Sequence, residues 1–247
     1  MKTDLVAFGA HPDDTELGCG GTLIKLTDEG KKVVVVDLTG GEMGTRGSVG
    51  TRHIEASKAG DVQGLLARDN LGLPDSELVN SREFQLPIIE RVRYYRPHIC
   101  LICAPADRHP DHGHASTLLI DALFFSGLRK IETFGPDRKP QKPHRPYHIL
   151  HYMQFQPFEP DLVIDITDTI DRKEDAIRSF SSQFNVSEPG DQPATVISDP
   201  DFFKSLRARA RHFGMLAGFT YGEAFKYVRK PIPFNSLEPL FSTSPGR

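Results

Sequence analysis

The chain opens on a stretch that decides its fold, Val6-Ala7-Phe8-Gly9-Ala10-His11-Pro12-Asp13-Asp14-Thr15-Glu16-Leu17-Gly18-Cys19-Gly20-Gly21. A short apolar run ends in a histidine and two adjacent carboxylates, and the residues that follow have the spacing of a helix. The polar residues should therefore lie where a strand passes into a helix. Sheets flanked by helices bind their ligands at such strand ends.

The first half of the chain repeats this alternation of apolar runs and helical spacing. We expect strands at residues 5–8, 33–36 and 99–104, and helices at 16–29, 52–66, 84–95 and 115–125. Thr51 is the expected cap of the second helix. This order predicts a single α/β domain with a doubly wound, mainly parallel sheet and helices on both faces.

The second half is less regular. Strands are expected at residues 148–155 and 162–166, and helices at 170–180 and 202–213. The proline-containing stretch 131–145 is either a lid or an exposed crossover, and the glycine-rich segment 40–50 is long enough to be a functional loop. We expect a domain over 1–230 and a proline-rich tail over 231–247 that lies on the surface or in a subunit contact.

Composition points to a small-molecule partner. The 247 residues are 38% hydrophobic, enough for one large core, and the net charge of -3 gives no field to attract nucleic acid or an anionic membrane. No apolar run approaches the ~20 residues that span a bilayer. The opening apolar segment is broken by His11, Asp13 and Asp14, so it does not read as a signal peptide.

The three cysteines favour a cytoplasmic location. An odd number cannot all be paired, which fits a reducing compartment. Cys100 and Cys103 have C-x-x-C spacing, but on a buried strand residues three apart face opposite sides. We therefore expect structural thiols there.

Two groups of possible metal ligands follow two of the predicted strands. His11 and Asp14 lie three apart after the first, and His109 and His112 lie three apart after the strand at 99–104. Parallel strands open on the same edge of a sheet, so the two groups can meet. Imidazole and carboxylate are ligands of zinc, and three protein ligands with one open position are typical of a catalytic site.

These residues resemble those of a known family. The segment Ala10–Gly21 together with His109-Pro110-Asp111-His112 resembles the LmbE-like (PIG-L-like) zinc de-N-acetylases. The loop 41–47, Thr51-Arg52, Glu55-Ala56 and Asp107-Arg108 are similar to the bacterial branch that makes bacillithiol, whose enzyme deacetylates N-acetyl-glucosaminyl-L-malate. The likeness covers residues 4 to 230 and implies a Rossmann-like fold, one zinc ion per chain and a homo-oligomer, since relatives form hexamers or other homo-oligomers.

The resemblance also implies roles for individual residues. His11, Asp14 and His112 correspond to the zinc ligands and Asp13 to the general base. His109 would stabilise the oxyanion, with Asp111 orienting it or holding its charge. Either Asp13 or His109 could protonate the leaving amine.

The residues that bind the substrate and the oxyanion are less clearly indicated than the metal ligands. Arg52 and Arg108 are the candidates to bind the two carboxylates of a malyl group, because a guanidinium matches a carboxylate in shape. Some relatives have an oxyanion tyrosine two residues before the first histidine of the second motif, where this chain has Asp107. Oxyanion binding would then depend on zinc and His109, or on a residue that the sequence does not identify.

Other functions remain as alternatives. The enzyme could deacetylate another N-acetyl sugar, such as a chitobiose-type substrate, or cleave thiol conjugates as an amidase. A non-catalytic metal- or nucleotide-binding module is the alternative of a different class. The nucleotide version is disfavoured, because the glycines do not form G-x-G-x-x-G directly after the strand.

Overall fold

The computed structural model describes residues 1–184, 195–199, 201–232 and 236. A seven-stranded sheet crosses its centre in the order β3-β2-β1-β4-β5-β7-β6. The strands are β1 (Leu5–Gly9), β2 (Val33–Thr39), β3 (Ala67–Leu73), β4 (Ile99–Ile102), β5 (His148–Tyr152), β6 (Leu162–Asp165) and β7 (Gly222–Tyr227). The first five are parallel, whereas β7 runs antiparallel to β5 and β6. The predicted mainly parallel, doubly wound sheet is confirmed.

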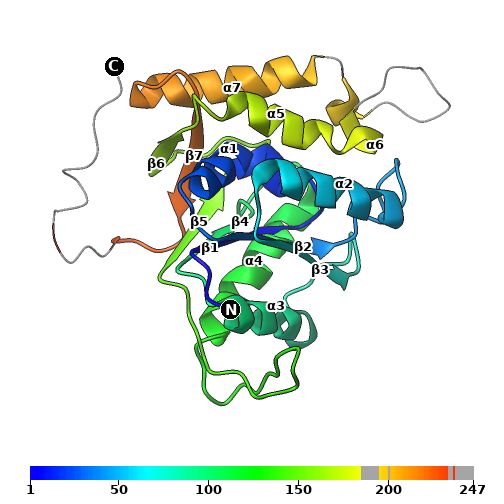
Figure 1. Cartoon of the computed structure of the whole chain (residues 1–247), viewed down its shortest axis with the longest axis vertical. Helices are drawn as coiled ribbons and strands as arrows, with labels where there is room; N and C mark the ends of the chain where they lie inside the picture. The colour runs from blue at the N-terminus through cyan, green and yellow to red at the C-terminus, as the bar shows by residue number, and fades with distance from the viewer. Residues whose placement is uncertain (185–194, 200, 233–235, 237–247) are drawn as a thin grey trace.

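Helices cover both faces of the sheet (Figure 1). On one face lie α1 (Asp14–Asp28), α2 (Val49–Gln63) and α5 (Ile170–Arg178), and on the other α3 (Arg82–Tyr95) and α4 (Pro110–Phe125). A short α6 (Ser181–Phe184), the 3₁₀ turn Val196–Ser198 and α7 (Phe202–Ala217) follow α5. No helix of the described ranges is long and apolar enough to cross a membrane.

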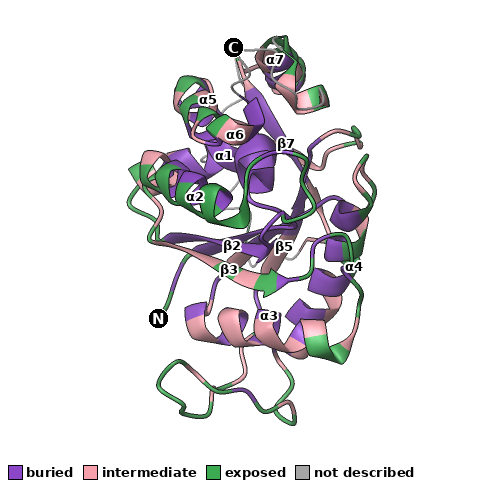
Figure 2. Cartoon of the chain, turned by 90° about the vertical axis from the view of Figure 1, so that its right-hand side faces the viewer, coloured by how far each residue is buried: buried purple, intermediate pink, exposed green. Residues whose placement is uncertain are grey.

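The core explains why the central strands are so apolar. Every residue of β1 and β2 is buried, because helices pack on both sides of these strands. Figure 2 shows the buried strands between helices whose outer faces are exposed, as on α2, or intermediate, as on α3. Cys19, Cys100 and Cys103 are free and buried, as expected of structural thiols.

Strand β3 is the main element that sequence patterning missed. Its three consecutive polar residues, Arg68-Asp69-Asn70, hide the strand pattern. It lies at the edge of the sheet, where such residues are tolerated, and it pairs with β2 from Val34 to Thr39. Strand β7 is a second element that the sequence pattern does not predict.

Two helix starts differ from expectation. Ser48, not Thr51, caps α2: its side chain accepts a hydrogen bond from the Thr51 NH at 3.1 Å. Helix α4 begins at Pro110 with His109 as its cap, so the second histidine motif lies in a helical turn rather than in a loop. Proline is favoured at the first position of a helix, because the NH group that it lacks would have no partner within the helix there.

The segment 131–146 is a crossover, which decides between the two alternatives left open. It packs beside α3 and α4, where Arg93 donates to the Ile131 carbonyl and the His144 NH donates to the Ser126 carbonyl. It leads into β5 at the amino ends of the parallel strands. The predicted tail lies almost wholly outside the described residues.

A buried ion cluster joins β2, β3 and α1. Arg68 Nε lies 2.8 Å from Asp37 Oδ2, and its Nη1 lies 2.5 Å from Glu16 Oε1. Both carboxylates are almost completely buried, and burial raises the pKa of Asp37 against the opposing effect of Arg68. The single guanidinium therefore compensates two buried acids.

Arg68→Met should destabilise the protein strongly. Removing the shared cation leaves two buried carboxylates unpaired, for which we expect a loss of about 3–5 kcal/mol in the free energy of unfolding. Urea denaturation measures it. Arg172→Met, which removes the exposed ion pair with Asp28, is the control and should cost under about 1 kcal/mol. Equal losses for the two variants would contradict the compensating role of Arg68.

Candidate active site

The candidate residues meet at the carboxyl ends of the parallel strands. His11, Asp13 and Asp14 follow β1, Asp75 follows β3, the segment 107–112 follows β4, and Gln154 follows β5. A cavity of about 160 Å³ is lined by Arg52 from α2 together with His11, Asp13, Asp14, Asp75, Arg108, His109, His112 and Gln154. Strands β1 and β4 are neighbours from which the chain winds in opposite directions, the position where such sheets bind ligands.

The predicted metal ligands lie together. His11 Nδ1 is 3.5 Å from Asp14 Oδ2, and His112 Nε2 is 3.1 Å from Asp14 Oδ1. The two imidazole rings lie 5.7 Å apart between centroids, and each approaches a different oxygen of the same carboxylate. One nitrogen of each histidine therefore faces Asp14.

The other nitrogen of each histidine is held by an outer carboxylate. His11 Nε2 lies 3.1 Å from Asp75 Oδ1 and 3.2 Å from Asp111 Oδ2. His112 Nδ1 lies 2.8 Å from Asp107 Oδ2. A carboxylate on the outer nitrogen fixes the tautomer and leaves the inner nitrogen as the ligand atom, the usual arrangement behind metal-bound histidines.

The electrostatics of this group suit a cation. Burial alone would lower the pKa of His112, but the Asp14 charge and the hydrogen bond to Asp107 raise it to about 9. Burial likewise opposes the charged form of His11, and hydrogen bonds to three carboxylates raise its pKa. Although burial opposes it, the charge of His112 lowers the pKa of Asp14. Four carboxylates thus surround two imidazoles.

The donor set fits zinc. Two imidazole nitrogens and a carboxylate, each fixed from behind, form the ligand composition of a catalytic zinc site. The two groups of described residues whose ligand atoms all lie within 4.8 Å of one another are other combinations, His11 with His109 and His112, and His11 with Asp75 and Asp111. His11 is common to both combinations and to the predicted set.

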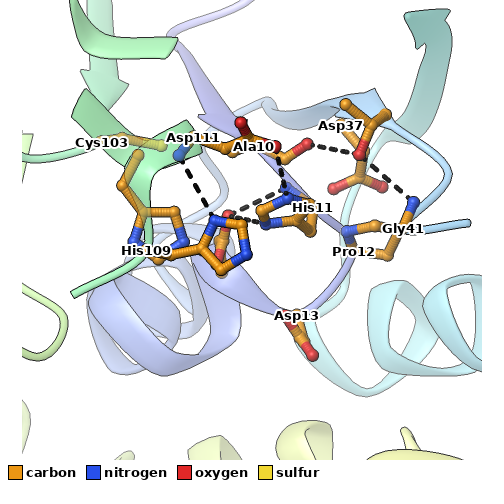
Figure 3. Close-up of polar contacts among 12 residues, drawn as sticks. Ala10, His11, Pro12, Asp13, Asp37, Gly41, Cys103, His109 and Asp111 are labelled. Atoms are coloured by element: carbon orange, nitrogen blue, oxygen red, sulfur yellow. Dashed lines mark hydrogen bonds and ion pairs between the residues drawn. The ribbon is translucent and has the colours of Figure 1, made fainter. Parts of the chain in front are cut away.

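Asp13 is set apart from these contacts. In Figure 3 its side chain extends away from the contacts around His11 and Asp111. It caps α1 with a φ of 113°, a left-handed conformation that non-glycine residues rarely adopt outside special sites. Burial raises its pKa to about 7, against the charge of Arg52.

Arg52 holds Asp13 from the other side. Its Nη2 lies 3.1 Å from Asp13 Oδ2 and also donates to the Pro12 carbonyl, while Nη1 donates to the Gly41 carbonyl at 3.3 Å. Gly41 makes room for it, because a Cβ there would lie 2.0 Å from Arg52 Nη1. Arg52, predicted to bind substrate, lines the cavity but is already paired with Asp13.

His109 lies beside His11, with ring centroids 4.7 Å apart (Figure 3). The Asp111 main-chain NH donates to His109 Nδ1 at 3.3 Å, which leaves the proton on Nε2. Burial and the neighbouring rings of His11 and His112 lower the pKa of His109. The Asp111 carboxylate, expected at His109, instead contacts His11, because the first turn of α4 points it toward β1.

Comparison with known proteins decides the family. The PIG-L family model, described as GlcNAc-PI de-N-acetylase, matches residues 6–123. Over 232 residues the chain is 33% identical to the diacetylchitobiose deacetylase of Thermococcus kodakarensis, covering 88% of this chain and 80% of that protein. The chain belongs to the PIG-L family.

Solved structures agree with PIG-L membership. A conserved protein from Thermus thermophilus is 34% identical, with a TM-score of 0.82 over 95% of this chain and 97% of that one. The N,N'-diacetylchitobiose deacetylase of Pyrococcus horikoshii, solved with an inhibitor, is 28% identical, with a TM-score of 0.75 over 92% of this chain and 84% of that one. This PIG-L protein is therefore an enzyme, a deacetylase that hydrolyses amides.

Three site residues of this PIG-L enzyme receive no role from sequence patterning. Asp75 and Asp107 hold the outer nitrogens of His11 and His112, and Gln154 Nε2 donates to Asp14 Oδ1 at 2.7 Å. Recognising β3 would have placed Asp75 just beyond a strand end. Asp107 belongs to the Asp107-Arg108 resemblance and departs from relatives with tyrosine, but neither observation gives it a role, and Gln154 carries no local signal.

Asp107→Asn should weaken zinc binding. An amide cannot stabilise the Nδ1–H of His112 as a carboxylate does, so we expect the zinc dissociation constant to rise about 10- to 100-fold. Competition with a chromogenic chelator measures this, with Asp137→Asn on the exposed crossover as the control. An unchanged zinc affinity in Asp107→Asn would show that Asp107 does not support His112 as a metal ligand.

Proposed function

We propose that this PIG-L enzyme uses zinc to hydrolyse the N-acetyl group of N-acetyl-glucosaminyl-L-malate, giving glucosaminyl-malate and acetate. One observation carries the proposal: His11 Nδ1 and His112 Nε2 face Asp14 in the same cavity in which Asp13 pairs instead with Arg52. Membership of a family of sugar deacetylases supports the N-acetylated sugar. The malyl group is supported by the motif resemblance at residues 41–47, 51–56 and 107–108.

The three ligands and Asp13 have different roles in the proposed reaction. His11, Asp14 and His112 would hold zinc, which when bound lowers the pKa of a water molecule toward ~7 and polarises the acetyl carbonyl. Asp13, with a pKa near 7, is matched to accept the water proton at neutral pH. Its Oδ2 is kept in place by Arg52, so that the carboxylate stays beside the cavity.

His109 acts as a hydrogen-bond donor in this proposal. Its Nδ1 accepts from the Asp111 NH, so its Nε2–H is available to donate to the oxyanion of the tetrahedral intermediate. The lowered pKa of His109 favours a neutral ring. Asp13, which already carries the proton taken from water, then protonates the leaving amine. The carboxylate of Asp111 supports His11 rather than His109.

A second candidate substrate is a chitobiose-type N-acetyl sugar. The relative with 33% identity is a diacetylchitobiose deacetylase. A thiol-conjugate amidase would share the chemistry, and a non-catalytic metal binder would have no use for Asp13 in a strained conformation. Arg108 is exposed at the cavity mouth, with its guanidinium 4.8 Å from the centre of the Phe155 ring, and it remains a candidate contact for a malyl carboxylate.

Substrate comparison tests the proposal. Acetate release by the zinc-loaded enzyme should be followed with N-acetyl-glucosaminyl-malate, N,N'-diacetylchitobiose and free N-acetylglucosamine at equal concentration. We expect the malate conjugate to give the highest kcat/KM. A higher value for diacetylchitobiose would favour the second candidate, and no release from any of the three would reject both. Cytoplasmic location and a homo-oligomeric state stay predictions.

A further inference from the structure

A second cavity of about 360 Å³ adjoins the catalytic one. The two cavities share Leu17, Gln154 and Phe155 as walls, and Gln154 also contacts Asp14. The rest of the second cavity is formed by α7 and the residues just before it. A substrate whose acetamide lies at Asp14 can therefore extend into this space.

Arg209, from α7, lines this second cavity, and no carboxylate of the described residues forms an ion pair with it. Its one hydrogen bond within the described part of the chain runs from Nη2 to the Leu17 carbonyl, at 2.9 Å. The two carboxylates whose charges reach it are engaged elsewhere. Glu223 contacts Lys173 Nζ at 2.6 Å, and Asp107 holds His112.

Three other arginines in the interior of this chain are well partnered. Arg68 pairs with two carboxylates and Arg52 with one. Arg93 satisfies its guanidinium with three main-chain carbonyls and the Thr133 hydroxyl. Arg209 differs because most of its donors have no acceptor among the described residues. Arg209 is partly buried, and this desolvation lowers its pKa.

Two aromatic rings and two acids line the second cavity together with Arg209. Phe155 and Phe202 line the same cavity, with ring centroids 6.5 Å apart, and can contact a carbon skeleton. Asp199 and Asp201 also line it, but both are exposed to solvent, and Asp201 is paired with Lys204 at 2.7 Å. Arg209 is thus less exposed than the two acids that line the same cavity.

We propose that Arg209 binds an anionic group, a carboxylate or a phosphate, on the part of the substrate that lies away from the acetamide. The inference rests on the proposed function and adds a specificity-determining residue to it. A guanidinium can offer two parallel N–H donors to either anion. Arg52 cannot serve equally, because Asp13 already occupies it.

A matched pair of ligands tests the role of Arg209. N-acetyl-glucosaminyl-malate and its dimethyl ester have similar shape and differ in charge. For Arg209→Met we expect KM for the diacid to rise about 10- to 100-fold, the range of a lost charge-assisted hydrogen bond. We expect kcat for the diacid and both constants for the ester to stay close to those of the parent. Arg209→Lys keeps the positive charge but lacks the two parallel N–H donors of the guanidinium. Its KM for the diacid should therefore lie between those of the parent and of Arg209→Met.

Control variants and a second anion complete the experiment. Arg211→Met removes a charge from the same helix outside the cavity and should leave both substrates unaffected. N-acetylglucosamine 1-phosphate, compared with the neutral methyl glycoside, shows whether the Arg209-dependent preference extends to phosphate. Equal losses for the diacid and the ester in Arg209→Met would overturn the inference.

A measurement of product binding can distinguish a failure of the Arg209 inference from a failure of the proposed function. Calorimetry with glucosaminyl-malate, the deacetylated product, needs no turnover. Binding that weakens in Arg209→Met, in a protein that releases no acetate, would reject the deacetylase function while keeping the anion site. Acetate release without any preference for the diacid over the ester would reject the anion site alone.

Discussion

Asp13→Asn is expected to retain zinc and to lose activity by about 10²- to 10⁴-fold in kcat, the usual contribution of a general base. The amide is nearly the same size as the carboxylate and keeps an oxygen for Arg52, but it cannot accept a proton at neutral pH. The Asp13 carboxylate pairs with Arg52 rather than with His11 or His112, so the metal ligands should stay in place. Zinc content and single-turnover acetate release measure the two effects.

The neighbouring aspartate provides a contrast to this variant. Asp14 contacts both His11 and His112, so Asp14→Asn should lower zinc affinity together with turnover. An Asp13→Asn enzyme with the parent's kcat would remove Asp13 from proton transfer. Loss of zinc in Asp13→Asn would instead place Asp13 among the ligands.

His112→Ala is expected to abolish both zinc binding and turnover. The substitution removes one of the two imidazoles that face Asp14, and it leaves Asp107 without the ring that it holds. Elemental analysis of the purified variant should find well under one zinc per chain. Its fold should persist, because the cluster lies at the sheet edge and the main apolar core does not include His112.

A histidine elsewhere controls for general loss of structure. His114→Ala, two residues further along the same helix, removes a ring that is 58% exposed and faces solvent. This variant should bind zinc and turn over substrate as the parent does. Full zinc occupancy in His112→Ala would show that the metal site lies elsewhere.

Sequence patterning predicted the strands that carry the site and the meeting of its two halves. The polar residues after β1 and β4 could be brought together because parallel strands open at one edge, and the structure places His11, Asp14 and His112 in contact. The spacing of these residues alone could not show which of them bind the metal and which, such as Asp13 and His109, lie beside it. That division came from resemblance to the family.

The outer shell of the site could not be predicted in the same way. The position of Asp75 depends on β3, a strand whose charged residues find partners only in the folded structure: Arg68 pairs with buried carboxylates, and Asp69 pairs with Arg91. Gln154 follows β5, and Arg209 lies on α7 beside the second cavity. Both are far along the chain from the histidine motifs, and a single polar residue after a strand or on a helix has no distinctive pattern. The Asp111 carboxylate contacts His11, and its main-chain NH donates to His109, because the direction of a side chain in the first turn of α4 depends on where that helix begins.

We propose that zinc held by His11, Asp14 and His112 makes this PIG-L enzyme a sugar deacetylase. The most direct test is to titrate metal-free protein with zinc while measuring acetate release from N-acetyl-glucosaminyl-malate. We predict no release without metal and a rise that saturates near one equivalent of zinc per chain, the number that a single three-ligand site would hold. Acetate release that is the same in metal-free and zinc-loaded protein would contradict zinc-dependent deacetylation.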